Sequence, residues 1–414
     1  MNTTGVRDGA CAPIVRTGLA IAAILTVSAG APARAQEWPS EPDSPALRSR
    51  LFFQMNEIGV AGRGARYADV LAWKLDGNLD RLIGWSGASA HLDLVHSYSE
   101  GSNRLVGSLQ GVDDNDIPNR HVRLYQAWID QSFANHRASL RAGVYDLETE
   151  FAKLGAAEQL INPSFRLSPE LARAGPNSAP AFPSTSLGVR LRLQPQGAFY
   201  LMGAALNAQA GTVGDRHGID AGFDKGALVL GEVGVRGAGK IALGAWRYTR
   251  DQPDIRDRTA AGSPVMRVAQ GVYGAVEAPL TGSPGQRNLS LFARAGLSDG
   301  ATTPLEGGWQ AGLRLRGVFE GRPDSSLSLG VAQAVISSRF RRISGGAGRS
   351  PGSTETVFEL TYSDRVLPIL SIQPDLQWVR RPRGGAGTGD VVIIGVRATA
   401  VLDTAKGLTD DGRP

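Results

Sequence analysis

The sequence predicts an all-β fold, a transmembrane antiparallel β-barrel of about 16 strands. Three observations lead to this prediction. Apolar and polar residues alternate in segments of about ten residues, most of these segments have one apolar face only, and Gly- or Pro-marked turns separate them. A membrane barrel requires this pattern, because alternate side chains meet lipid and water while the closed sheet leaves no unpaired edge in hydrocarbon.

The composition is that of a folded protein and excludes several other classes. The 414 residues are 42% hydrophobic and 20% charged, with a formal net charge of +5. Neither a disordered chain nor a collagen-like fibre has this composition. Beyond residue 35 there is no apolar run of about 18 residues, the length that a membrane-spanning helix needs. No run of Lys and Arg is long enough for a nucleic-acid interface, so we expect no nucleic-acid partner.

The first 35 residues have the pattern of a secretory signal peptide. Arg7 and Arg16 form a positive region, residues 17–30 an apolar core, and Ala33-Arg34-Ala35 an A-x-A cleavage site. We therefore expect export, cleavage after Ala35 and a location in the bacterial outer membrane. A single membrane anchor is the alternative, but the apolar run is short for one.

Sixteen segments qualify as strands, an even number as in bacterial barrels. They are residues 51–60, 66–79, 87–98, 121–133, 137–146, 186–194, 197–207, 229–237, 239–250, 265–278, 287–298, 307–319, 325–336, 354–364, 368–378 and 389–402. Residues 104–111 are a further candidate. A barrel of this size encloses an aqueous channel. The chain is thus expected to comprise a signal peptide (1–35), an N-terminal periplasmic segment (36–50), the barrel (51–403) and a C-terminal tail (404–414).

The polar faces of these strands predict the chemistry of the lumen. If the apolar faces meet lipid, charged side chains at alternate positions point into the channel. The candidates for lining it and contacting solute are Arg137, Arg141, Arg190, Arg192, Arg294, Arg314, Arg316, Glu359, Asp375 and Arg397. Guanidinium donors and carboxylate acceptors together suit the hydroxyl groups of a neutral polyol, whereas an unopposed arginine ring favours anions. A plainer interpretation is that each arginine only keeps the lumen hydrated.

One connection, residues 147–185, is far longer than the others and lacks clear strand alternation. Long connections of this kind are usually functional or disordered. Two interpretations stay open from the spacing alone: a loop folded into the lumen as a constriction, or a mobile extracellular loop.

Several motifs, in family order, resemble the carbohydrate-selective porins of Gram-negative outer membranes, the OprB-like family. They are residues 137–151 (RASLRAGVYDLETEF), 161–165 (INPSF), 244–249 (GAWRYT), 270–277 (QGVYGAVE), 370–379 (LSIQPDLQWV) and 391–397 (VVIIGVR). The resemblance implies a sixteen-stranded porin that admits sugars by passive diffusion, with inward loops that narrow the lumen.

The resemblance also implies which residues begin the constriction loop. They are Asp146, Glu148, Glu150, Phe151, Asn162, Phe165 and Arg166. Arg166 stands where a small glycine is expected, which would tighten the pore or change its charge. The printed chain also ends without the terminal aromatic residue that outer-membrane proteins usually present to the assembly machinery.

We expect a channel without cofactor or metal rather than an enzyme. His91 and Asp93 share one strand face, but no serine in a nucleophile-like turn accompanies them. Residues 113–116 (DDND) lack the glycine and distal glutamate of a calcium loop, so we expect a solvated loop. The alternatives are a general or anion-preferring porin without sugar specificity, an outer-membrane barrel enzyme and a secreted sugar-binding sandwich. The expected partners are membrane lipid, small sugars and the assembly machinery; the identity of the sugar and the formation of a homo-oligomer stay open.

Overall fold

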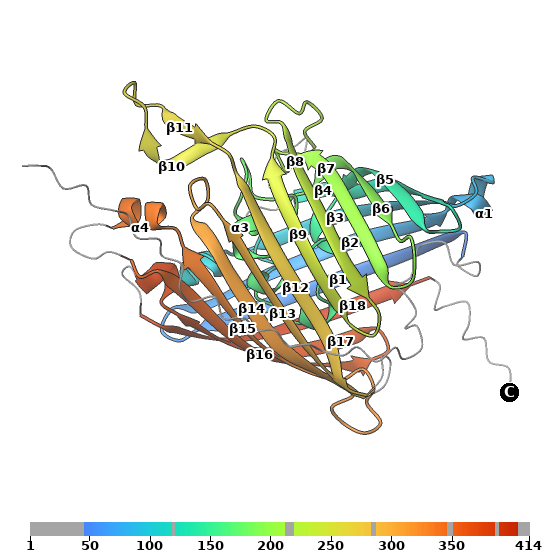
Figure 1. The fold of residues 1–414 in the computed structure, drawn as a ribbon. Helices are drawn as coiled ribbons and strands as arrows, with labels where there is room; N and C mark the ends of the chain where they lie inside the picture. Colours follow the sequence, from blue (N-terminus) through green and yellow to red (C-terminus); the bar gives the residue numbers. More distant parts are fainter. Residues whose placement is uncertain are drawn as a thin grey trace, which may run out of the picture. The chain divides into compact units, whose positions relative to one another are not determined.

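The computed structural model describes residues 45–117, 121–211, 219–282, 287–345, 351–385 and 389–404. Within these ranges, sixteen antiparallel strands form a closed barrel (Figure 1). The expected signal peptide (1–35), residues 36–44 of the expected periplasmic segment and residues 405–414 of the expected tail lie outside the described residues.

Each of the sixteen predicted segments overlaps one barrel strand. The barrel strands are β1 (Leu47–Val60), β2 (Gly64–Asn78), β3 (Ala88–Ser99), β4 (His121–Phe133), β5 (Ala138–Tyr145), β6 (Ser186–Leu193), β7 (Phe199–Asn207), β8 (Ala227–Arg236), β9 (Lys240–Tyr248), β12 (Gln270–Thr281), β13 (Asn288–Ser298), β14 (Leu305–Arg316), β15 (Ser326–Ile336), β16 (Thr354–Leu367), β17 (Leu370–Arg380) and β18 (Val391–Asp403). The first strand therefore begins at Leu47, ahead of the expected barrel start at residue 51.

Pairing of the first and last strands closes the sheet. β1 and β18 run antiparallel, with Arg50 opposite Asp403 at one end and Val60 opposite Ile393 at the other. The remaining neighbours follow chain order, except that β9 pairs with β12 because the separate hairpin β10 (Gln252–Arg258) and β11 (Pro264–Arg267) lies between them in the chain. Closure pairs the edge backbone groups that an open sheet would expose to hydrocarbon.

The predicted alternation appears as an outer apolar face and an inner polar face. Leu243 and Leu297 point outward and are each 64% exposed, whereas Arg190, Glu232 and Arg294 on the inner face are buried. The arrangement suits lipid on the outside of the barrel and water or packed chain inside.

The connections at the two ends of the barrel differ in length. One end has mostly tight turns, together with α1 (Leu79–Ile83); the other end has the long connections with α2 (Ser102–Val106), α3 (Pro169–Ala172) and α4 (Ser338–Ser344). The hairpin β10–β11 projects at this second end, beside α4 (Figure 1). In bacterial barrels the long loops are extracellular and the short turns periplasmic, which orients the chain.

The further candidate strand at residues 104–111 is wrong. Residues 102–106 form α2, and Gly107 ends this helix in the left-handed conformation, with φ of 72°. Short 3-10 turns lie at Leu147–Thr149, Gly155–Ala157, Pro163–Phe165 and Pro382–Gly385. No helix in the described part of the chain has the length and apolarity needed to cross a membrane.

Replacing Leu243 by Arg tests the lipid-facing side of the barrel. Because β9 places this side chain outward near its middle, Leu243→Arg should lower the free energy of unfolding by about 2–4 kcal/mol. Equilibrium unfolding of protein folded in lipid vesicles measures the loss. The matched variant Ile241→Arg, nearer the end of the same strand, should cost only about 0–1 kcal/mol. Equal losses at the two positions would contradict this placement of β9 in the bilayer.

Candidate functional site

Two irregular stretches of chain pack against the inner wall of the barrel. The first inward segment is residues 107–117, between β3 and β4, and the second inward segment is residues 146–185, between β5 and β6. At the junction of β5 and the second segment Val144, Tyr145 and Leu147 are all buried, so alternation ends where the chain leaves the wall. Its contacts are those of a loop folded into the barrel rather than of a loop projecting from it.

Carboxylates of the wall hold the second inward segment by its backbone N–H groups. Glu232 accepts a hydrogen bond from the N–H of Ala152 (2.7 Å), Glu277 from that of Ala156 (3.0 Å) and Glu359 from that of Asn162 (2.9 Å). Glu232 also accepts from the hydroxyls of Tyr200 and Tyr273 and pairs with Lys240. These acids supply the acceptors that an irregular buried backbone lacks within itself.

Arginines of the wall hold the same segment by its carbonyl groups. Arg294 donates to the carbonyls of Ala152 (2.8 Å) and Arg166 (2.9 Å), and Arg314 donates to that of Gly155 (3.1 Å). Arg294 is 2% exposed. A guanidinium with several fixed donors can satisfy several carbonyls at once, which makes it a suitable anchor.

The first inward segment is held in the same way, from β16 and β18. Glu355 accepts from the N–H groups of Leu109 and Gln110, both at 3.0 Å, and Arg397 forms an ion pair with Asp114. Asp113 is only 1% exposed, so the expectation of a solvated loop at residues 113–116 is wrong. These polar residues are buried because the opposite wall supplies partners that are remote in sequence.

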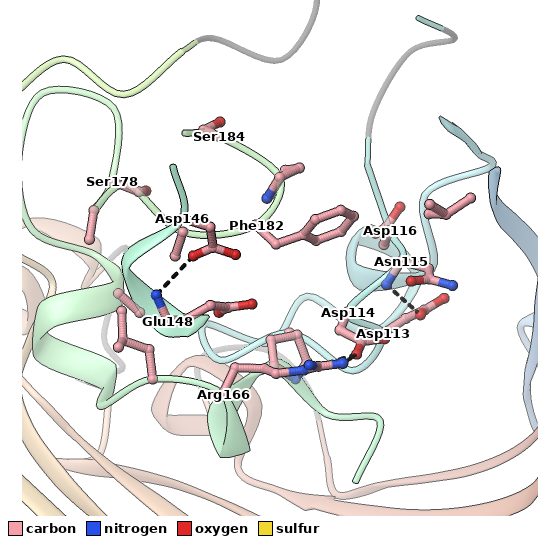
Figure 2. A pocket seen from close by; sticks show the side chains of 18 of the residues that line it. Asp113, Asp114, Asn115, Asp116, Asp146, Glu148, Arg166, Ser178, Phe182 and Ser184 are labelled. Carbon is pink, nitrogen blue, oxygen red and sulfur yellow. Dashed lines mark hydrogen bonds and ion pairs between the residues drawn. The ribbon is translucent and has the colours of Figure 1, made fainter. Parts of the chain in front are cut away.

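Contacts between the two segments join them across the lumen. The Asn162 side-chain amide donates to the carbonyl of Gly111 (2.9 Å), and the Arg166 guanidinium pairs with Asp114. Figure 2 shows Arg166 extending toward Asp114, with Asp146 and Glu148 on the other side of the pocket. The unexpected arginine at position 166 thus bridges the two segments.

Two cavities border the second inward segment. The outer chamber, of about 760 Å³, is lined by both inward segments and by β1–β4, and the inner chamber, of about 480 Å³, by residues toward the end with the short turns. Both are lined by Lys74, Gln126 and Thr149, so they meet at the level of these three side chains. Sequence reasoning missed all three. Alternation places Lys74 and Gln126 on polar faces, but nothing local distinguishes them from other polar positions.

The predicted site residues fall into three groups. Arg141, Arg190, Arg192 and Glu150 line the inner chamber, and Asp146, Glu148 and Arg166 line the outer one. Arg294, Arg314, Glu359, Arg397, Phe151, Asn162 and Phe165 are turned to the inward segments or belong to them, outside both chamber linings. Asp375, also outside both linings, accepts a hydrogen bond from Gln377, which in turn donates to the carbonyl of Val112 in the first inward segment. Arg137 lies exposed in the turn before β5, and Arg316 lies exposed at the end of β14, on the same face of the strand as Arg314; both lie outside the two chamber linings.

The inner chamber contains a rigid cluster of charges. Arg190 bonds to Glu150 at 2.8 and 2.9 Å and to Asp130 at 2.6 Å. Arg141 bonds to the same Asp130 at 3.0 Å, and its guanidinium lies 3.7 Å from the ring centroid of Trp128. The Trp128 ring also stacks with that of His91, whose Nδ1 lies 2.7 Å from Asp76 rather than joining Asp93 in a dyad. Among the described residues, no group of three or more His, Cys, Asp or Glu could hold a metal ion.

Burial and charge set the protonation of the outer chamber. Burial raises the pKa of Asp146 to about 6 and, with the nearby Asp146, raises the pKa of Glu148 to about 8. Burial also acts on Asp114, but Arg397 and Arg166 outweigh it and lower the pKa of that carboxyl. The outer chamber therefore combines Asp114, whose pKa is lowered, with Asp146 and Glu148, whose raised pKa values lie near neutral pH.

Comparison with known proteins gives consistent matches. The model of the carbohydrate-selective porin, OprB family, matches residues 62–402. Porin B of Pseudomonas aeruginosa is 26% identical over 129 residues, and the alignment spans 28% of each protein. The putative porin QuiX of Acinetobacter baylyi is 25% identical over 126 residues, which span 27% of this chain and 29% of that protein. These alignments thus cover less than a third of either relative.

Solved structures show the same fold. The structure of Pseudomonas putida OprB at high pH superposes with a TM-score of 0.76 and 20% identity, covering 86% of this chain and 94% of that chain. The low-pH structure of the same protein gives a TM-score of 0.54.

Removing the Arg294 guanidinium tests the anchoring of the second inward segment. Arg294→Ala leaves the carbonyls of Ala152 and Arg166 without their donor, so the segment should loosen and single-channel conductance should become larger and noisier. Recordings in planar bilayers measure both quantities. Arg247→Ala, at an exposed position on the outer face of β9, is the matched control and should behave like the unmodified chain. An unchanged conductance in Arg294→Ala would show that this arginine is not an anchor.

The raised pKa values predict a pH-dependent ion preference. Asp146 and Glu148 are protonated at low pH and lose their protons as the pH rises through about 6 and about 8, so the outer chamber becomes more negative. The permeability ratio of K⁺ to Cl⁻, taken from reversal potentials in a KCl gradient, should rise between pH 5 and pH 9. Glu148→Gln should remove the upper part of this rise, while Glu158→Gln, outside both chamber linings, should leave it intact. A ratio independent of pH would contradict this assignment.

Proposed function

The chain belongs to the carbohydrate-selective porins of the OprB family, and on that premise we propose that it lets sugars cross the bacterial outer membrane by passive diffusion. The observation that carries the proposal is the pair of chambers inside one closed barrel, which share Lys74, Gln126 and Thr149. Family and fold indicate a channel rather than an enzyme.

The residues where the chambers meet suit a sugar. Lys74 offers a cationic donor, Gln126 both a donor and an acceptor, and Thr149 a hydroxyl. A sugar hydroxyl likewise donates and accepts, so it can exchange water for these groups without leaving a polar atom unsatisfied. The chamber volumes lie in the range of small-molecule sites.

Charged side chains on both sides of the point where the chambers meet offer further hydrogen-bond donors and acceptors for sugar hydroxyls. On the inner side Arg141, Arg190 and Arg192 supply fixed donors, and Glu150 supplies acceptors. On the outer side Asp146, Glu148 and Arg166 line the path. Arg190 is wholly buried and holds Glu150 in place, so the other six are the residues that we assign to sugar contact. Charged wall residues that bond to the inward segments affect sugar passage indirectly, because they hold in place the segments that narrow the channel.

The outer membrane is the location that family and barrel imply. The proposal further includes export with cleavage after Ala35 and insertion by the outer-membrane assembly machinery. It is compatible with a homo-oligomer, which cross-linking of the protein in membranes would detect.

Sugar block of the ion current tests the proposal. Glucose or a related sugar should reduce single-channel conductance in a saturable way, and proteoliposomes should swell in iso-osmotic sugar. Gln126→Leu removes one donor and one acceptor, so half-block should need about 2 to 10 times more sugar, the equivalent of one hydrogen bond. Gln194→Leu, in the turn between β6 and β7, is the matched control.

Two outcomes distinguish the alternatives. A conductance that no sugar alters would leave a general porin without sugar specificity. A reversal potential dominated by Cl⁻, again with no effect of sugar, would favour an anion-preferring porin.

A further inference from the structure

One wall of the outer chamber is apolar, although the inner face of the barrel is mostly polar. Five side chains of β1 to β4 that point inward line this wall: Phe52, Val70, Ala72, Val95 and Tyr125. All five belong to one cluster of packed hydrophobic side chains. Apolar surface that faces a water-filled lumen is unfavourable unless something apolar covers it.

Phe182 of the second inward segment covers part of this apolar wall and is itself only half-buried. Its ring meets that of Tyr125 edge-on, with 5.4 Å between the ring centroids and 74° between the ring planes. The Tyr125 hydroxyl donates to Asp146, which fixes the ring against which Phe182 rests. In Figure 2 the Phe182 ring extends into the pocket. Phe182 therefore has a defined orientation and still exposes part of its ring to the chamber.

Polar groups line the chamber around this ring. In the view of Figure 2, Asp146 and Glu148 lie on one side of Phe182, and residues 113–116 lie on the other. The Arg166 side chain is 35% exposed, so part of its guanidinium is open to a solute. The outer chamber therefore offers a solute an apolar platform with polar groups around it, an arrangement that is typical of small-molecule sites.

A sugar in its ring form has the matching distribution of polar and apolar groups. A pyranose with equatorial hydroxyls carries polar groups around its rim and C–H groups on its two faces. When a C–H face covers a phenyl ring, both surfaces leave water, and the polarised C–H groups meet the negative face of the π-system. An open-chain polyol carries the same kind of hydroxyls but has no rigid apolar face.

We infer that Phe182 is the platform of a sugar subsite in the outer chamber, which selects pyranose rings over open-chain polyols. The sugar ring lies on Phe182, and its hydroxyls bond to Glu148 and Arg166. The inference deepens the proposed function and rests on it, since it requires that sugars enter the channel. Hydrogen bonds alone do not distinguish a ring from an open chain with the same hydroxyls, so the aromatic ring adds selection by shape.

Block of the ion current by matched polyols tests the inference. Glucose should half-block the channel at a concentration about 2 to 10 times lower than D-glucitol, which has the hydroxyl configuration of glucose but no ring; the factor corresponds to one aromatic contact. myo-Inositol, a six-membered ring without an anomeric centre, should act like glucose. All three solutes are neutral, so charges in the channel do not separate them.

Variants of Phe182 distinguish stacking from support of the inward segment. Phe182→Leu keeps an apolar side chain against Tyr125 but removes the aromatic face. Half-block by glucose should then need about 2 to 10 times more sugar, while block by D-glucitol and the conductance without sugar stay unchanged. Phe182→Trp should retain the preference for glucose. Phe199→Leu, at an exposed position on β7, is the matched control and should behave like the unmodified chain.

The outcomes distinguish failure of this inference from failure of the proposed function. Equal block by glucose and D-glucitol in the unmodified protein would overturn the subsite and leave a sugar porin, even where a variant fails to fold. Equal weakening of both polyols in Phe182→Leu, together with an altered conductance, would give Phe182 a structural role only and overturn the inference as well. A conducting channel that no polyol blocks would overturn the proposed sugar specificity itself.

Discussion

Irregular chain inside a closed barrel needs partners for its own N–H and C=O groups, and much of this structure follows from that need. The second inward segment does not pair as a strand with the barrel wall, although it lies inside the barrel. Glu232 and Glu359 accept from its N–H groups, while Arg294 donates to its carbonyls. Without these side chains the buried backbone groups would each cost about 1–3 kcal/mol.

The same need divides the charged residues of the lumen by role. Those whose strands face the inward segments serve as anchors, and those left facing the two cavities determine what a solute meets. Arg294 and Arg190 look alike as inward-facing arginines of strands, but the first contacts loop carbonyls and the second lies in the wall of the inner chamber. A census of arginines therefore overstates the number available to a solute.

The similarity of this fold to that of distant relatives has a physical reason, because the barrel wall and the lumen depend on different features of the sequence. The barrel requires only strands of sufficient length with alternating apolar and polar residues, joined by turns. The fold is therefore shared with the Pseudomonas putida protein although the two sequences are only 20% identical. The chemistry of the lumen depends on individual side chains. Arg166 illustrates this, because it bridges to Asp114 and so joins the two inward segments across the lumen.

Alternation and turn residues are local properties, so the sixteen strands, the direction of their apolar faces and the extent of the long connection could be predicted from the amino-acid sequence. It also identified Glu359 and Arg397 as inward-facing, since strand parity is local too. The folded chain was needed to show that these residues hold the inward segments, that Asp113 is buried, and that Lys74, Gln126 and Thr149 lie where the two chambers meet. Those contacts depend on which strand lies opposite which loop across the lumen. The partners are far apart in the sequence, so no local pattern predicts which of them meet.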